Sequence, residues 1–145
     1  EAVRQWLLIE PELDVQQVGV MGFCMGGRFA LLYGAQAPLA VVAPFYGMVP
    51  PKAEDLQGIC PVVGGWGEKD MVMGKHGKLL NKHLDKLGVE HDVKSYPDAG
   101  HSYMNNHDTF IFRELGDYSP LRSKYNEAAA EDSWERVFAF FDKVL

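Results

Sequence analysis

The sequence predicts an α/β fold in which a parallel sheet is flanked by helices. Short apolar segments bounded by glycine, proline and polar turn residues alternate with longer segments of helical periodicity. This alternation is typical of βα units, whose strands run parallel with right-handed crossovers. A chain of 145 residues has the length of one domain, here 1–145. The predicted strands are 18–22, 41–46, 62–66 and 92–96.

The first predicted element is a helix over 1–10 that Pro11 ends. It precedes the first strand. Its apolar residues are expected on one side of the helix: Val3, Trp6, Leu7 and Leu8.

The remaining helices are expected between and after the strands. They begin near Met25, Lys52 and Lys75, and Gly88 ends the third of these as a residue suited to the position after a helix. A last helix starts from Asn126. Its apolar residues recur at helical spacing and should pack on the sheet: Trp134, Val137, Phe138, Phe141 and Leu145.

The most informative segment joins the first strand to the helix after it. The strand ends in Gly22-Phe23-Cys24-Met25-Gly26. A nucleophile on a tight, strained strand-to-helix turn needs small residues two positions before and after it, because larger side chains would collide. The pattern predicts a nucleophile elbow centred on Cys24. The alternative is a cysteine that only packs as a small hydrophobe.

An acid and a histidine follow in the chain order that such a nucleophile requires. Asp70 comes just after the strand 62–66, and His101 follows the strand 92–96 through a Pro/Gly loop. Parallel sheets place their sites at the carboxyl ends of strands, so Cys24, Asp70 and His101 can converge. Asp70 could instead only cap a turn. Asp98 is a competing acid, but it is too near His101 in sequence to reach round to it easily.

The other four histidines are expected on the solvated surface because they lie in polar stretches. They are His76, His83, His91 and His107.

Four segments resemble the dienelactone hydrolase family, whose members are α/β-hydrolases, and this family carries a cysteine at the elbow. The segments are GFCMGG at 22–27, FYG at 45–47, WGEKD at 66–70 and AGHSY at 99–103, and 130–136 resembles the family's last helix. The resemblance implies an α/β-hydrolase-type sheet and hydrolysis of an ester or lactone through a thioester on Cys24.

The resemblance also assigns roles to individual residues. Cys24 is the nucleophile, His101 the base and Asp70 the acid that orients it. The N–H of Met25 is one oxyanion donor. Tyr46, at the end of the second strand, is placed to line the substrate pocket or only to pack.

One departure from the family concerns the substrate. Members that open dienelactones hold the substrate carboxylate with an arginine shortly after the histidine, whereas His101 is followed by Ser-Tyr-Met-Asn-Asn. A neutral or differently shaped ester is therefore expected.

A second departure concerns length. Only 23 residues precede Cys24, whereas the family's sheet has several strands ahead of the nucleophile. The sequence is therefore expected to lack the N-terminal strands. That region would carry the second oxyanion donor, much of the pocket and a glutamate that interacts with the resting cysteine. A catalytically incompetent fragment that serves only as a fold or interaction module is the alternative function.

The missing strands have a structural consequence. The strand from Val18 to Gly22 would form an unpaired apolar edge, which favours association. A homodimer that covers this edge is therefore expected.

Composition excludes several function classes. The net charge is −6 without a basic cluster, so nucleic acid and anionic membranes are not expected partners. No apolar run approaches the roughly 20 residues of a membrane span. No cofactor is expected. A metal site of Cys24, His101 and His107 matches no common ligand spacing. Two cysteines give no disulfide framework, and a free nucleophilic thiol indicates the reducing cytoplasm.

The longest irregular segment runs from Asn105 to Tyr125. It is either a surface loop with a short helix, or a lid or oligomer contact, since long loops are often functional.

Overall fold

The computed structural model describes residues 1–13, 15–106 and 116–145. Its centre is a four-stranded parallel sheet in the order β1-β2-β3-β4. The strands are β1 (Gly19–Phe23), β2 (Val41–Phe45), β3 (Val62–Gly67) and β4 (His91–Tyr96). The sequence prediction of four parallel strands is confirmed, with ends shifted by one residue at most.

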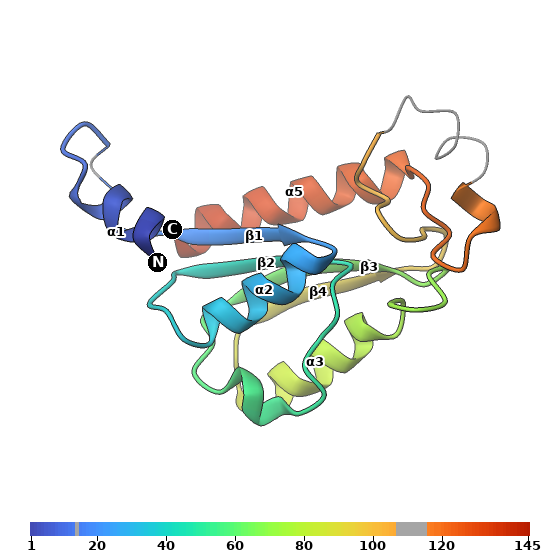
Figure 1. The fold of residues 1–145 in the computed structure, drawn as a ribbon, viewed down its shortest axis with the longest axis horizontal. Coiled ribbons are helices and arrows are strands. Elements are labelled where there is room, and N and C mark those ends of the chain that lie inside the picture. Colours follow the sequence, from blue (N-terminus) through green and yellow to red (C-terminus); the bar gives the residue numbers. More distant parts are fainter. Residues whose placement is uncertain (14, 107–115) are drawn as a thin grey trace.

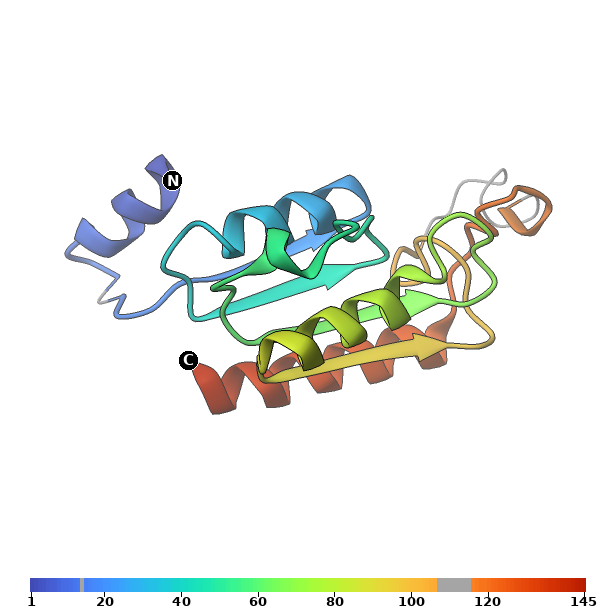
Figure 2. The same ribbon diagram turned by 90° about the horizontal axis from the view of Figure 1, so that it is seen from below.

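Helices cover both faces of this sheet. Helices α2 (Met25–Gly34) and α3 (His76–Leu87) lie on one face, and α5 (Glu127–Val144) lies on the other (Figures 1 and 2). The helix α1 (Ala2–Ile9) lies beyond the amino ends of the strands (Figure 1). A short 3-10 turn, η2 (Gly116–Tyr118), precedes α5.

The helix expected near Lys52 is the clearest error in the predicted elements. The structure has only one 3-10 turn there, η1 (Ala53–Leu56). Pro50 and Pro51 precede it and Gly58, at φ +82°, follows it. These residues leave too little uninterrupted chain for an α-helix.

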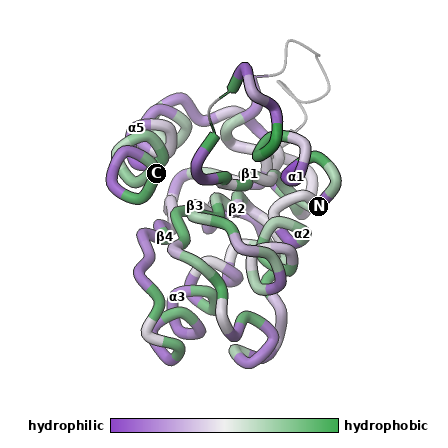
Figure 3. Tube along the Cα trace, turned by 90° about the vertical axis from the view of Figure 1, so that its left-hand side faces the viewer, coloured by the Kyte–Doolittle hydropathy of each residue, from purple (hydrophilic) through white to green (hydrophobic). Residues whose placement is uncertain are grey.

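The core lies between the two helical layers. Every residue of β2 and of β3 is buried, as expected for central parallel strands that are covered on both faces. The hydropathy of α3 and α5 alternates along each helix, because only one side of each faces the sheet (Figure 3).

Helix α5 is rotated relative to the orientation predicted from its apolar residues. Asn126 caps it by accepting a hydrogen bond from Ala129 N–H at 3.0 Å. The side facing the sheet is formed by Ala129, Ala130, Ser133, Val137 and Phe140. Of the predicted residues, Val137 is buried and Phe141 is partly buried against the core, whereas Trp134, Phe138 and Leu145 are exposed. Trp134 and Phe138 instead stack on each other, with ring centroids 5.8 Å apart.

The rotation has a packing cause. Three small residues, Ala129, Ala130 and Ser133, allow the first turns of α5 to approach the sheet closely, and large aromatic residues in their place would hold it away.

The prediction that the remaining histidines are solvated is wrong for His83. This side chain is 8% exposed, and its Nε2 lies 3.1 Å from the carbonyl oxygen of Pro50. His76 is half-buried, and its Nδ1 accepts a hydrogen bond from Val49 N–H at 3.1 Å. His107 lies outside the described residues, as does much of the segment from Asn105 to Tyr125.

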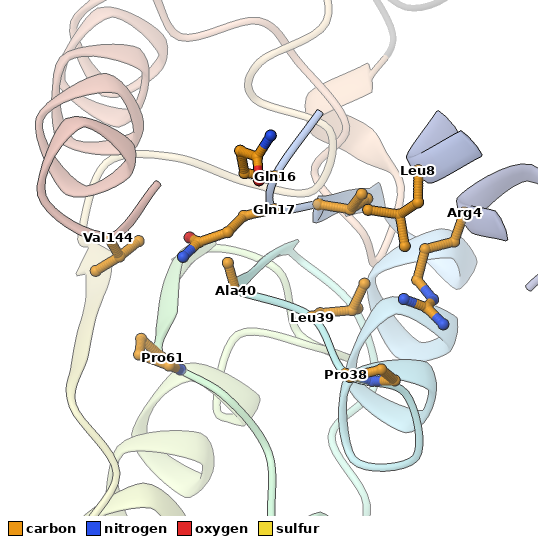
Figure 4. A pocket seen from close by; sticks show the side chains of 10 residues that line it. Arg4, Leu8, Gln16, Gln17, Pro38, Leu39, Ala40, Pro61 and Val144 are labelled. Atoms are coloured by element: carbon orange, nitrogen blue, oxygen red, sulfur yellow. The ribbon is translucent and has the colours of Figure 1, made fainter. Parts of the chain in front are cut away.

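Helix α1 buries none of its residues. Val3 and Trp6, on its predicted apolar side, are exposed, and Glu1 accepts a hydrogen bond from the Tyr33 hydroxyl at 2.6 Å. The space between α1 and the sheet is a cavity of about 550 Å³ whose lining includes Arg4, Gln17 and Val144 (Figure 4).

Along the described chain, no helix combines the length and apolarity needed to cross a membrane.

The two edges of the sheet differ in chemistry. On β4, Lys94 pairs with Asp132 of α5 at 2.9 Å, and Asp92 pairs with Arg136. Strand β1 carries no charge, and among the strands of the described residues it pairs with β2 alone. Within the part of the chain that the structure describes, α2 is the one helix that packs against β1. The edge at β1 is therefore the open one.

Candidate active site

The candidate site lies at the carboxyl ends of the strands, at the opposite end of the sheet from the cavity beside α1 (Figures 1 and 4). Cys24 occupies the single residue between β1 and α2 and has φ +54° and ψ −120°, a strained conformation for a residue with a side chain. Its N–H donates to Phe45 O at 3.0 Å, which ties the turn to β2. Cys24 is exposed at the amino end of α2.

Only one of the two glycines assigned to the elbow is required for space. A Cβ on Gly22 would lie 2.1 Å from the carbonyl oxygen of Gly26, so β1 and α2 could not keep their present distance. A Cβ on Gly26 would meet no atom within 4 Å. The expectation that position 26 must be small is therefore wrong, because this position of α2 faces open space.

The helix start also provides donors for negative charge. Met25 is the first residue of α2, and the first N–H groups of a helix have no acceptor within it. The amino end of a helix additionally favours a neighbouring anion. The Met25 N–H, directly after Cys24, is thus available to an oxyanion.

Asp70 is 3% exposed and follows β3. Its Oδ1 accepts from the N–H groups of Val72 and Met73 at 2.9 Å each. Its Oδ2 lies 2.7 Å from Nδ1 of His101. Burial raises the pKa of Asp70, but the hydrogen bonds from His101, Met73 and Val72 outweigh it and hold the pKa below its usual value.

The ionised carboxylate fixes the protonation pattern of the ring. A carboxylate can only accept hydrogen bonds, so Nδ1 of His101 is the donor in this bond, and Nε2 is the nitrogen that has a lone pair in the neutral ring. His101 is 4% exposed. Its backbone N–H donates a hydrogen bond to the carbonyl oxygen of Leu121 at 2.8 Å. The competing Asp98 is exposed and pairs with Lys69 at 3.5 Å.

Tyr46 connects the histidine to the elbow. Its ring meets His101 edge-on at 5.1 Å and lies 6.0 Å from the ring of Phe23, the residue before Cys24. Burial raises the pKa of Tyr46, and the negative charge of a Cys24 thiolate would raise it further. Its hydroxyl donates to Oδ1 of Asn105 at 3.4 Å. The structure thus brings together Cys24, Tyr46, Asp70 and His101.

The sequence did not identify the residues that hold the loop after β2. Trp66 Nε1 donates to Gly47 O at 2.9 Å, and His76 accepts from Val49 N–H. No local pattern marks these contacts, since the partners lie far apart in sequence. Among residues 1–13, 15–106 and 116–145, no three His, Cys, Asp or Glu side chains are grouped so that they could hold a metal ion.

The chain is similar to known proteins over its whole length. The model of the dienelactone hydrolase family matches residues 1–145. Carboxymethylenebutenolidase of Rhodococcus opacus is 32% identical over 145 residues, with 91% of this chain and 52% of that protein covered. A putative carboxymethylenebutenolidase of Saccharolobus solfataricus is 31% identical, with 99% of this chain and 51% of that protein covered.

Solved structures agree on the fold. The structure titled m3DLH superimposes with a TM-score of 0.77 at 23% identity. The superposition includes 99% of this chain and 59% of the m3DLH chain. A fungal esterase of Rhizomucor miehei gives a TM-score of 0.68 at 12% identity, covering 99% and 56% respectively. The chain spans about half the length of the curated relatives it matches. It belongs to the dienelactone hydrolase family and has the α/β-hydrolase fold over the part that it contains.

Proposed function

We propose that the chain carries the catalytic residues of a hydrolase that cleaves a carboxylic ester or lactone through a thioester. The observation that carries the proposal is the buried 2.7 Å hydrogen bond between Asp70 and His101, at the sheet end where Cys24 occupies a strained turn. A buried carboxylate, a ring nitrogen with a free lone pair and an exposed thiol are the groups that nucleophilic acyl transfer needs.

The reaction follows from these groups. Nε2 of His101 accepts the thiol proton, and the Cys24 sulfur attacks the carbonyl carbon. The oxyanion is stabilised by the N–H of Met25. His101 then returns the proton to the leaving alcohol oxygen as the C–O bond breaks, which leaves a thioester. Water attacks the thioester with His101 as base, and the acid product leaves as the thiol re-forms.

Asp70 has two roles in this reaction. It stabilises the imidazolium that forms and keeps the proton on Nδ1, so that Nε2 is the nitrogen that faces the reaction.

The two cysteines supply a matched test. Cys24→Ala should reduce hydrolysis of p-nitrophenyl acetate to the rate of buffer alone. Cys60→Ala should leave it unchanged, because Cys60 is half-buried beside β3 and away from the site. Equal turnover in the two variants would refute the nucleophile assignment.

A neutral ester with an apolar portion is the substrate class that we propose. Exposed apolar side chains, Phe23 and Met25, flank Cys24, and Tyr46 adjoins Phe23. No basic residue occurs at 102–106. A neutral aryl ester should therefore have a higher kcat/KM than its carboxylate-bearing analogue, and the reverse order would contradict this proposal.

The alternative is a catalytically incompetent fragment that acts only as a fold or interaction module. Alkylation of the thiol by iodoacetamide, measured beside hydrolysis, separates the two functions. A reactive Cys24 without turnover would support the fragment.

Two further proposals concern partner and compartment. A second copy of the chain would cover the open edge at β1, and a well-folded monomer in sedimentation would contradict this. The free thiols of Cys24 and Cys60 favour the reducing cytoplasm.

A further inference from the structure

The loop that carries His101 is held at both ends by the same serine. Tyr96 ends β4 before the loop, and Tyr103 lies two residues after His101. Ser133 Oγ of α5 lies 2.8 Å from each of the two tyrosine hydroxyls. The rings of Tyr96 and Tyr103 are 5.1 Å apart. Asp132 completes the chain of hydrogen bonds by accepting from Tyr96 at 2.7 Å.

These hydroxyls are buried, which makes their pairing costly to lose. Tyr103 is 0% and Ser133 is 2% exposed. A Cβ on Gly65 of β3 would lie 2.1 Å from the Tyr103 hydroxyl oxygen, so the sheet needs a glycine to admit that hydroxyl. A phenylalanine at position 103 would fill the core without requiring a glycine at position 65. Hydrophobic packing alone therefore does not account for the polar group.

Tyr103 is also connected to the catalytic ring. It meets Tyr46 edge-on at 5.4 Å, and Tyr46 in turn meets His101 at 5.1 Å. The residue between His101 and Tyr103 is Ser102, whose φ of +56° is strained for a residue with a side chain. Such a conformation persists only when the surrounding structure holds it. The Tyr103 carbonyl oxygen contributes by accepting from Asn126 N–H at 3.0 Å.

We propose that Tyr103 and Ser133 are positioning residues, which act through the loop to keep His101 in the orientation that bonds Asp70. The inference rests on the proposed function for its catalytic meaning. Two separate contacts restrain this short segment, because the His101 ring is bonded to Asp70 and the Tyr103 hydroxyl is bonded to Ser133 of α5. Loss of the tie would allow Ser102 to relax and the ring to turn away from Asp70.

The test removes single hydroxyls. Tyr103→Phe and Ser133→Ala each remove part of the tie, and Ser95→Ala is the matched control. The Ser95 hydroxyl is buried on β4, next to Tyr96, yet it has no hydrogen-bond partner among the described residues. Urea unfolding establishes that each variant is folded before any other measurement.

The quantity measured is the tautomer ratio of His101 in the full chain, which the ¹⁵N chemical shifts of its imidazole report. The wild-type ring should carry its proton on Nδ1. Ser133→Ala and Tyr103→Phe should lower the ratio of Nδ1–H to Nε2–H by about 5- to 30-fold, as expected when a buried hydrogen bond is lost. Ser95→Ala should leave the ratio unchanged. Under conditions of turnover, kcat should fall with KM unchanged.

The results separate positioning from a merely structural role. Folded Ser133→Ala and Tyr103→Phe variants with the wild-type ratio would overturn the inference, as would a wild-type ring protonated on Nε2. Failure of the proposed function would instead appear as full turnover in Cys24→Ala and would leave the tautomer ratios as they are.

Discussion

Replacing Gly22 by alanine should distort the elbow by an amount that the structure defines. The added Cβ would lie 2.1 Å from Gly26 O and 2.4 Å from Gly26 C, both of them backbone atoms. Real Cβ atoms essentially never come within 3.0 Å of such atoms, so the start of α2 must move by at least 0.9 Å. Overpacking of this kind costs about 1–3 kcal/mol of unfolding free energy. A displacement near 1 Å at a reacting group can lower turnover by about 100-fold.

Gly26→Ala is the matched control within the same turn. Its Cβ would meet no atom within 4 Å, and alanine is a better helix former than glycine by about 0.5–1 kcal/mol. The control should therefore be as stable as the wild type or slightly more stable.

Urea unfolding of both variants provides the assay. With m of about 1–3 kcal/mol/M, the midpoint for Gly22→Ala should fall by about 1 M, while that for Gly26→Ala should not fall. Equal midpoints for the two variants would refute the argument that the approach of α2 to β1 requires glycine at position 22.

Three other predictions concern titrating and buried polar groups. Ser95→Ala should raise the unfolding free energy by up to about 1 kcal/mol, because it removes an unpaired buried hydroxyl; a lower urea midpoint would contradict this. Burial lowers the pKa of His76, so stability should decline as pH falls below about 6.5, and His76→Asn should flatten that part of the unfolding profile. Asp70→Asn should reduce ester turnover by about 10⁴-fold, whereas Asp98→Asn should not, and the opposite pattern would reassign the acid.

The sheet and the candidate site could be predicted because their signals are local. An apolar run followed by Gly22 and Cys24 specifies a strand, a turn and a helix start within a few residues. Asp70 and His101 each follow a predicted strand, and parallel strands bring their carboxyl ends to one edge of the sheet. The order of these segments along the chain thus places the three residues near each other.

The errors occur where distant contacts decide the outcome. Trp134 and Phe138 have the spacing of a buried helix face, yet small residues such as Ser133 approach the sheet instead. His83 lies in a polar stretch, but a carbonyl from the loop after β2 satisfies its ring and permits burial. Periodicity cannot reveal a partner that lies far away in the sequence.

The strained residues show how the fold supports its site. Among the described residues, the non-glycine residues with positive φ are Cys24, Tyr46, Ser102 and Arg122. The first three form the elbow, the adjoining ring and the His101 loop, and Arg122 follows the residue whose carbonyl holds His101. At about 1–3 kcal/mol each, their combined strain is comparable with the 5–15 kcal/mol net stability of a typical domain.

This strain must be offset by contacts that are specific to each strained residue. Cys24 N–H bonds Phe45 O at 3.0 Å and Tyr46 N–H bonds Gly65 O at 2.9 Å, so the sheet itself holds two of them. Ser102 lies in a loop, outside the sheet, and its neighbour Tyr103 provides the tie to α5 instead. Sequence periodicity predicted the orientation of α5 only in part, and α5 is therefore the helix on which the His101 loop depends.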